Sequence, residues 1–284
     1  MRPDCERPPL CQDALRRALV APAGPYHALE VLATVPSTNT ALVAAARNGA
    51  PDRTVLIAEH QSAGRGRAAR RWVAPARSGL ALSVLLRPTE VPQARWSWLP
   101  LLAGVALSRT VSTVGGLPAV LKWPNDLLLG SHRRKVAGIL AEVVPAPSTS
   151  APAVVVGIGL NVTLRPDELP VPEVTSLALE RATCTDRDLL VRALLRALDT
   201  ELRQWCAQQG DPVASGVRAA YQQRCATLGE QVRVELPGQS VLVGTAVEID
   251  TEGRLVVISD GQRRALSVGD VTHVRPAHRG EWAE

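Results

Sequence analysis

The chain has 284 residues, of which 46% are hydrophobic and 21% charged, and this balance excludes a disordered or fibrous protein. A chain of this length is too long for one minimal domain and too short for three full ones, so we expect one large domain and one small one. The net charge of +5 would suit an anionic ligand or nucleic acid, but the arginines are spread along the chain, as on an ordinary solvated basic surface.

The five cysteines are odd in number and none is spaced Cys-x-x-Cys, so the sequence predicts neither a disulfide framework nor a zinc site. A reducing cytoplasm fits this pattern best. Acidic residues and prolines occupy the first positions, where a signal peptide would need an unbroken apolar stretch. The longest apolar run, at 99–107, falls short of the ~20 residues that a membrane span requires. We therefore expect a cytoplasmic protein with no membrane partner.

Residues 1–27 are rich in proline and arginine and are predicted to form a tail, with one short amphipathic helix at 13–20. A strand-like run follows at 31–35. Good helix formers then occupy 41–47, and Ser37 or Thr38 before them is a natural N-cap. This order predicts that a structured domain begins near residue 28.

Two apolar runs of strand length, at 55–58 and 80–86, flank a polar segment rich in glycine and arginine. A loop of this length inside a compact domain is usually functional or mobile. Further on, a helix is predicted from Pro100 to Val114, and a strand at 119–123 is cut off by Pro124.

Two more strands are predicted at 136–144 and 154–158, separated by a proline-rich turn, and Thr185 opens a capped helix. From about residue 227 the composition shifts to five short alternating runs separated by turn residues, which predicts a small barrel. We therefore expect an N-terminal tail at 1–27 without a DNA-binding domain, a large domain at 28–225, a small β-barrel at 226–276 and a tail at 277–284.

The segment from Glu59 to Trp72 carries arginines around two glycines, Gly64 and Gly66. Glycine lets backbone N–H groups approach an anion, and arginine offers forked donors that match carboxylate and phosphate oxygens. No Gly-Lys-Ser or Gly-Lys-Thr follows, so this is not a Walker loop. By itself the run is about as consistent with a solvated basic turn or an RNA contact as with an active-site loop.

A second segment, from Lys122 to Asp126, reads Lys-Trp-Pro-Asn-Asp and places polar side chains at the end of a strand. Asn-Asp after proline is also ordinary turn chemistry. The runs at 135–142 and 157–161 add a lysine and an asparagine, and each alone is more often structure than site.

Taken together, five ordered motifs resemble the biotin protein ligase family: Ser37-Thr38-Asn39, the loop from Gly64 to Trp72, Lys122 to Asp126, Lys135 to Glu142, and Gly157 to Asn161. The resemblance implies an α+β fold, in which a mixed-sheet catalytic domain of the biotin/lipoate-ligase kind is followed by a small SH3-like β-barrel. It also implies ATP-dependent activation of biotin to biotinyl-5'-AMP, followed by transfer to a lysine of a biotin carboxyl carrier protein.

The resemblance assigns biotin contacts first. Ser37, Thr38, Asn39 and Gln61 would bond to the neutral ureido ring. The loop residues Gly64, Arg65, Gly66 and Arg67 would surround the carboxylate and the α-phosphate, and Lys135 would bridge them. Lys135 and Arg67 are therefore the implied catalytic residues.

The resemblance assigns the adenine nucleotide to Arg70, Lys122, Asn125, Asp126 and Asn161. ATP and biotin are then substrates, and Mg²⁺ would arrive with ATP near Asp126 without a metal site fixed by the protein. Two features depart from the family pattern: Ala69 stands where glycine is usual, and two extra residues appear before Lys135.

Two alternatives remain open on the sequence. Lipoate ligases and octanoyl transferases share the implied fold and the lysine, but usually lack the two most specific motifs. A bifunctional biotin repressor would bind DNA through three helices in roughly 60 residues, whereas about 30 precede the large domain here. We expect a monofunctional ligase that binds no nucleic acid, whose carrier is that of acetyl-CoA carboxylase or a related carboxylase. The sequence leaves a homodimer open.

Overall fold

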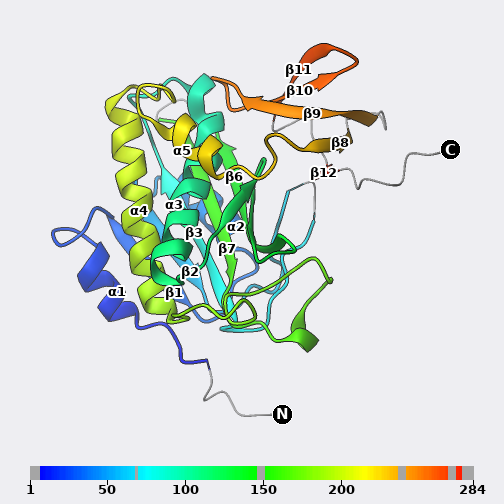
Figure 1. Ribbon diagram of the computed structural model, residues 1–284. Helices are drawn as coiled ribbons and strands as arrows, with labels where there is room; N and C mark the ends of the chain where they lie inside the picture. The colour runs from blue at the N-terminus through cyan, green and yellow to red at the C-terminus, as the bar shows by residue number, and fades with distance from the viewer. Residues whose placement is uncertain (1–6, 68–69, 146–150, 236–240, 268–272, 277–284) are drawn as a thin grey trace.

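A computed structural model describes residues 7–67, 70–145, 151–235, 241–267 and 273–276, and places them in two β-sheets with helices around the larger one (Figure 1). Strands β1 and β2 of the larger sheet are parallel, and the other neighbouring pairs are antiparallel. The sheet has the order β1-β2-β3-β7-β6-β5-β4. Its strands are β1 (Ala28–Leu32), β2 (Thr54–Ala58), β3 (Gly79–Leu86), β4 (Val120–Lys122), β5 (Asp126–Leu129), β6 (Arg134–Val144) and β7 (Ala153–Asn161).

Helices cover both faces of this sheet. Helices α3 (Leu99–Val114) and α4 (Arg187–Ala207) pack on each other and belong to the larger apolar core, while α2 (Thr38–Arg47) packs on β3, β7 and β6. The smaller core holds Leu42 of α2 against Leu85 of β3. Because successive strand residues point to opposite faces, β3 supplies apolar side chains to both cores, which explains why its sequence is apolar on both sides of Ser83. The expected α+β class with a mixed sheet is confirmed.

The segment predicted as an N-terminal tail is packed instead. Helix α1 (Gln12–Leu19) lies against α4 and β1, and its Leu15 and Leu19 are fully buried. The Tyr26 hydroxyl donates to the carbonyl of Leu195 at 2.7 Å. Two leucines four residues apart make one buried helix face. The sequence analysis predicted a short helix at 13–20. Because the residues around it are rich in proline, it did not predict that this helix packs on the large domain.

Several boundaries also differ from the sequence prediction. Strand β1 ends at Leu32, three residues before the predicted end. Asp186, not Thr185, caps α4 by accepting a hydrogen bond from the N–H of Leu189 at 3.0 Å. Strand β5 and helix α5 (Val217–Arg224) were not predicted at all.

The second sheet has five antiparallel strands in the order β11-β10-β9-β8-β12. They are β8 (Gln231–Glu235), β9 (Val241–Ile249), β10 (Leu255–Ser259), β11 (Gln262–Leu266) and β12 (His273–Pro276). The chain enters this domain along the edge of the first sheet, where the N–H of Ala226 donates to the carbonyl of Leu121 in β4 at 2.7 Å.

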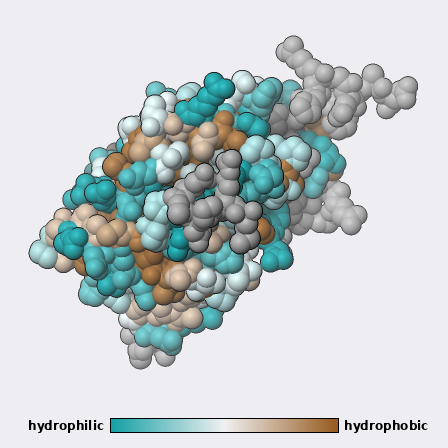
Figure 2. All heavy atoms as spheres, turned by 90° about the horizontal axis from the view of Figure 1, so that it is seen from below, coloured by the Kyte–Doolittle hydropathy of each residue, from teal (hydrophilic) through white to brown (hydrophobic). Residues whose placement is uncertain are grey.

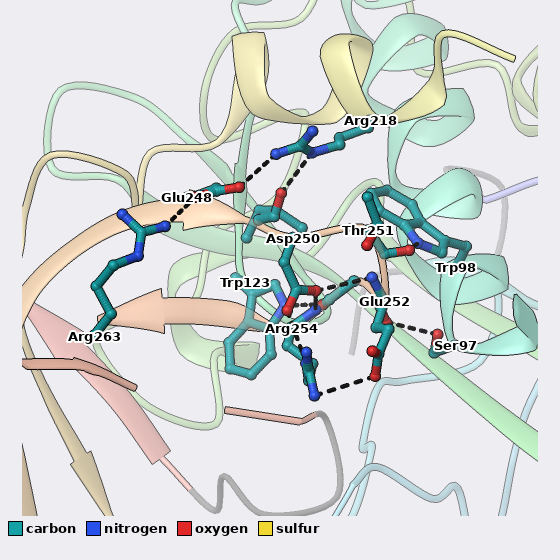
Figure 3. Close-up of polar contacts among 12 residues, drawn as sticks. Ser97, Trp98, Trp123, Arg218, Glu248, Asp250, Thr251, Glu252, Arg254 and Arg263 are labelled. Carbon is teal, nitrogen blue, oxygen red and sulfur yellow. Dashed lines mark hydrogen bonds and ion pairs between the residues drawn. The ribbon is translucent and has the colours of Figure 1, made fainter. Parts of the chain in front are cut away.

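The turn between β9 and β10 of the small domain packs against the large domain (Figure 3). Its carbonyl groups accept three hydrogen bonds from the large domain: Trp98 Nε1 donates to Thr251 at 2.9 Å, and Trp123 Nε1 donates to Gly253 at 3.0 Å. Ser97 Oγ donates to Glu252 at 2.8 Å. Trp123 belongs to the Lys-Trp-Pro-Asn-Asp segment, so the small domain directly contacts one of the proposed functional motifs.

On the face shown in Figure 2, hydrophilic residues surround small groups of apolar ones. None of the helices in the described part of the chain combines the length and the apolar character needed to cross a membrane.

Candidate active site

A pocket lies where the N-terminus of α2, the arginine-rich loop and strands β3, β6 and β7 meet. Ten of the residues expected from the sequence line it: Ser37, Thr38, Asn39, Gln61, Arg65, Gly66, Arg67, Arg70, Asn125 and Lys135. Four others, Gly64, Lys122, Asp126 and Asn161, are not part of this lining.

The first side of the pocket is the start of α2. Ser37 is the N-cap, and its side chain accepts a bond from the N–H of Thr40 at 3.4 Å. The N–H of Thr38 donates to Gln61 Oε1 at 2.8 Å, which fixes the Gln61 amide against the helix. These neutral donors and acceptors suit an uncharged polar ring.

The floor of the pocket depends on glycines in β6 and β7. Gly138 and Gly159 face each other in the strand register. A Cβ atom on Gly159 would lie 2.6 Å from Cε2 of Trp72, and one on Gly157 would lie 2.0 Å from Asn39 Oδ1. The absence of side chains therefore lets the Trp72 indole and the Asn39 amide approach the strands. Trp72 lines the pocket, and the sequence analysis did not select it as a site residue.

The arginine-rich loop folds back on itself. The N–H of Gly66 donates to the carbonyl of Arg70 at 2.7 Å, and the N–H of Trp72 donates to that of Gly64 at 2.9 Å. A Cβ atom on Gly64 would lie 2.3 Å from the carbonyl oxygen of Trp72. Gly64 thus shapes the backbone rather than the pocket surface. Ala69, the departure from the family pattern, lies outside the described residues.

Five cationic residues line the pocket: Arg65, Arg67, Arg70, Arg71 and Lys135. Arg65 Nη1 lies 2.9 Å from Glu142 Oε1, and Lys135 Nζ lies 2.6 Å from Asp126 Oδ1. Burial lowers the pKa of the Arg67 guanidinium, and the neighbouring charge of Arg70 lowers it further. Arginine nevertheless stays protonated in proteins, so Arg67 brings a partly desolvated positive charge to the pocket. This arrangement favours the binding of an anion.

Asn125 links the loop to the strands. Its Oδ1 accepts a hydrogen bond from Arg67 at 3.5 Å, and its Nδ2 donates to the carbonyl of Ile139 at 3.1 Å. The N–H of Ile139 in turn donates to the Asn125 carbonyl at 2.9 Å. Pro124 and the turn between β4 and β5 therefore present Asn125 to the pocket, as the sequence motif suggested.

Three of the residues expected to bind nucleotide lie behind or beside this lining. Asp126 forms an ion pair with Lys135. Lys122 in β4 lies opposite Asp126 in the β4–β5 register. Asn161 is buried at the end of β7, where its Nδ2 donates to the carbonyl of Thr175 at 3.0 Å. Within the described ranges, no three His, Cys, Asp or Glu side chains gather as a metal site would require.

Comparison with known proteins identifies the class to which this fold and pocket belong. A sequence model of the Biotin/lipoate A/B protein ligase family matches residues 31–161, and a model of the Biotin protein ligase C terminal domain matches 227–274. The Biotin--[acetyl-CoA-carboxylase] ligase of Mycobacterium tuberculosis is 43% identical over 95% of this chain and 97% of its own length.

Two further relatives agree. The Bifunctional ligase/repressor BirA of Bacillus subtilis is 30% identical over 87% of this chain and 72% of its own. The crystallised biotin protein ligase of Aquifex aeolicus, in complex with biotin and ATP, has a TM-score of 0.71 at 26% identity and covers 89% of this chain and 100% of its own. The chain therefore belongs to the biotin protein ligase family. The expected pairing of a mixed-sheet catalytic domain with a small SH3-like C-terminal domain is confirmed.

Proposed function

We propose that this chain is an ATP-dependent biotin ligase that works in two steps. In the first, a carboxylate oxygen of biotin attacks the α-phosphorus of ATP, and pyrophosphate leaves to give biotinyl-5'-AMP. In the second, the amine of a carrier lysine attacks the biotinyl carbonyl carbon, AMP leaves, and an amide forms as the amine loses its proton. Family membership and the chemistry of the pocket support this proposal.

The observation that carries the proposal is that two kinds of polar side chain line the pocket, neutral hydrogen-bonding ones and cationic ones. Ser37, Thr38 and Gln61 offer uncharged hydrogen-bonding groups, while Arg65, Arg67 and Lys135 bring positive charge. Biotin has a group to match each kind, because a neutral ureido ring lies at one end and a carboxylate at the other. Apolar Ile139 and Ile158 also line the pocket and would contact the hydrocarbon part of the ligand.

The cations would assist the first step by electrostatics. A carboxylate that attacks a phosphate must overcome the repulsion of two anions, and the transition state gathers more negative charge. We propose that Arg67 and Lys135 stabilise that charge and that Arg65 orients the carboxylate. Gly64 and Gly66 would allow the loop to fold closely over it.

Nucleotide binding is assigned to the neighbouring polar residues. Arg70 and Asn125 reach the pocket, and Lys122, Asp126 and Asn161 remain proposed through the family pattern alone. Mg²⁺ bound to ATP would neutralise phosphate charge. Asp126 is the one carboxylate of these assigned residues, and its Oδ1 lies 2.6 Å from Lys135 Nζ, so the protein would supply at most part of the metal's coordination.

The acceptor that we propose is the biotin carboxyl carrier protein of acetyl-CoA carboxylase, as the name of the M. tuberculosis relative suggests. The boundary predicted near residue 226 between the two domains, the cytoplasmic location and the lack of nucleic-acid binding remain part of the same proposal. A homodimer is left open.

The proposal is tested by measuring pyrophosphate release from ATP with biotin or with lipoate as the free acid. We expect release with biotin, followed by transfer of label to a carrier domain and none to the same domain with its target lysine changed to arginine. Faster release with lipoate, or equal labelling of the lysine-free domain, would refute the proposal. A gel-shift assay with promoter DNA at ~150 mM salt, where non-specific contacts are weak, tests the absence of DNA binding. Specific retention of the DNA would refute the prediction that the enzyme is monofunctional.

A further inference from the structure

Ser83 lies behind the pocket wall and contacts two residues that line it. It is fully buried in β3, and its Oγ lies 2.7 Å from Thr38 Oγ1 and 2.6 Å from Asn39 Oδ1. Ser83 itself does not line the pocket. Its hydroxyl is therefore placed to act on the pocket only through these two side chains.

The orientation of the Asn39 amide is fixed by two acceptors. Asn39 Nδ2 donates to the carbonyl of Leu140 at 3.1 Å and to Glu142 Oε2 at 2.9 Å. Glu142 holds this position because its other oxygen, Oε1, pairs with Arg65. Since both partners of Nδ2 can only accept, the amide oxygen of Asn39 must face Ser83.

Counting hydrogens then fixes the direction of the remaining bonds. A serine hydroxyl has one hydrogen, and Asn39 Oδ1 has none, so Ser83 donates to Asn39. The 2.7 Å contact between Ser83 and Thr38 also needs a hydrogen, and only the Thr38 hydroxyl can supply it. The Thr38 hydroxyl also lies 3.2 Å from Gln61 Oε1, but that oxygen already accepts from the Thr38 N–H at 2.8 Å, and the contact with Ser83 is the shorter of the two. Whether the Thr38 hydrogen points to Ser83 or to Gln61, it is used inside the protein. Thr38 Oγ1 consequently has only lone pairs left for a ligand.

We propose that Ser83 and Glu142 are positioning residues that hold the Thr38 hydroxyl as a hydrogen-bond acceptor toward the pocket. The pocket would then select a ring that offers an N–H at this point, as the ureido ring of biotin does, and reject one that offers only a carbonyl oxygen. This inference rests on the proposed function, because it assumes that biotin's ring binds beside Thr38.

The first test replaces Ser83 with alanine. Ser83→Ala leaves Asn39 Oδ1 and the Thr38 hydroxyl without their partner, and unpaired buried polar groups are costly. We expect the Kd for biotin, measured by calorimetry, to rise about tenfold or more. The KM for ATP and kcat at saturating biotin should change little.

A double-mutant cycle tests whether Ser83 acts through Thr38. We expect Thr38→Val to weaken biotin binding, and Ser83→Ala added to it to weaken binding little further, because the effects of residues that act together are not additive. Fully additive effects would overturn the proposal. Ser108→Ala is the matched control, because Ser108 is also buried and its Oγ donates to the Ala119 carbonyl at 2.9 Å, away from the pocket. This control should keep the biotin affinity of the wild type.

The second test uses Glu142, which is partly exposed and can be changed even if Ser83→Ala fails to fold. Glu142→Ala removes the acceptor for Asn39, whereas Glu142→Gln keeps an oxygen there and removes the charge. We expect Glu142→Ala to weaken biotin binding and Glu142→Gln to restore most of it. If glutamine is as damaging as alanine, the ion pair with Arg65 is what matters, and positioning through Asn39 is overturned.

The two proposals fail in distinguishable ways. A wild-type chain that binds no biotin would overturn both. A wild-type chain that binds biotin, with Ser83→Ala and Glu142→Ala binding it equally well, would overturn only the positioning roles.

Discussion

Lys135 lies at the start of β6 and lines the pocket. Its Nζ is 2.6 Å from Asp126 Oδ1 and 6.0 Å from the centre of the Trp72 ring. If its charge serves the developing phosphate charge, Lys135→Ala should lower pyrophosphate release by orders of magnitude and change the Kd for biotin only slightly. Single-turnover adenylation and calorimetry measure the two effects separately.

The control for this prediction is Arg133→Ala, because Arg133 is a nearby cation that pairs with Glu230 on the surface at 2.8 Å. We expect this variant to form adenylate at the wild-type rate. Near-normal pyrophosphate release by Lys135→Ala would remove Lys135 from the mechanism.

The glycines beneath Trp72 allow a second prediction. A Cβ on Gly159 would lie 2.6 Å from the indole, whereas one on Gly138 would lie 3.3 Å from it, a contact that a small shift relieves. Gly159→Ala should therefore displace Trp72 and raise the Kd for biotin strongly, while Gly138→Ala should have a much smaller effect. Tryptophan fluorescence and calorimetry would check this, and equal effects of the two variants would contradict it.

At the residue scale, the sequence predicted residues that line the pocket but not Ser83, which is buried behind them. Arg65 and Arg67 belong to a run whose composition is unusual, so the run stands out by itself. Ser83 is a single polar residue within an otherwise apolar strand, and its hydrogen-bond partners lie more than 40 positions away in the sequence. A lone serine inside a core strand was the available signal for it.

The arginine-rich loop is the element on which retention of the intermediate would depend. Its hydrogen bonds at Gly66 and Trp72 form a narrow fold, and Arg67 extends from it to Asn125 at the strand ends. A loop held to the phosphate in this way would cover the mixed anhydride and keep water from it.

We therefore predict that Arg67→Ala releases biotinyl-5'-AMP while some synthesis continues. Free adenylate would label lysines of an unrelated protein, which blotting for biotin detects. Arg67→Lys is the matched variant, because it keeps the charge and loses the forked geometry. If Arg67→Ala makes adenylate and the bystander stays unlabelled, the loop is not held by Arg67.

The secondary-structure elements that the sequence missed have weak local signals. Strand β5 contributes only four residues and follows a proline turn, so its leucines were not separated from the motif before them. Helix α5 has only eight residues and begins after Gly216, which has a φ of 77°. By contrast, α3 and α4 are long and apolar on the buried side, and both were predicted.

At the scale of the whole molecule, the sequence predicted two domains but not how they touch. The shift in composition after residue 226 marks the small domain, and turn residues separate its strands. The contact itself joins Trp98 and Trp123 to carbonyl groups 153 and 130 positions further along the chain. No local pattern connects residues at such distances, so this interface could be found only in the structure.

The two tryptophans make a matched pair for testing whether the small domain supports the nucleotide site (Figure 3). Both are buried, and each indole donates one hydrogen bond to the same turn. Trp123 also lies between Lys122 and Pro124 in the proposed nucleotide-binding segment, and its N–H donates to Thr227 Oγ1 at 3.0 Å. Trp98 has no place in that segment.

Trp123→Phe should lower the free energy of unfolding by about 1–3 kcal/mol, because it leaves the buried Gly253 carbonyl without its donor, and Trp98→Phe should lower it less, because Thr251 is exposed and water can replace the lost donor. Thermal and denaturant unfolding measure this loss. Only Trp123→Phe should also raise the KM for ATP several-fold, since only Trp123 holds Asn125 and Asp126 in place through the backbone between them. The Kd for biotin should stay near that of the wild type in both variants. Equal ATP kinetics in the two variants would show that the turn stabilises the fold without acting on the nucleotide site.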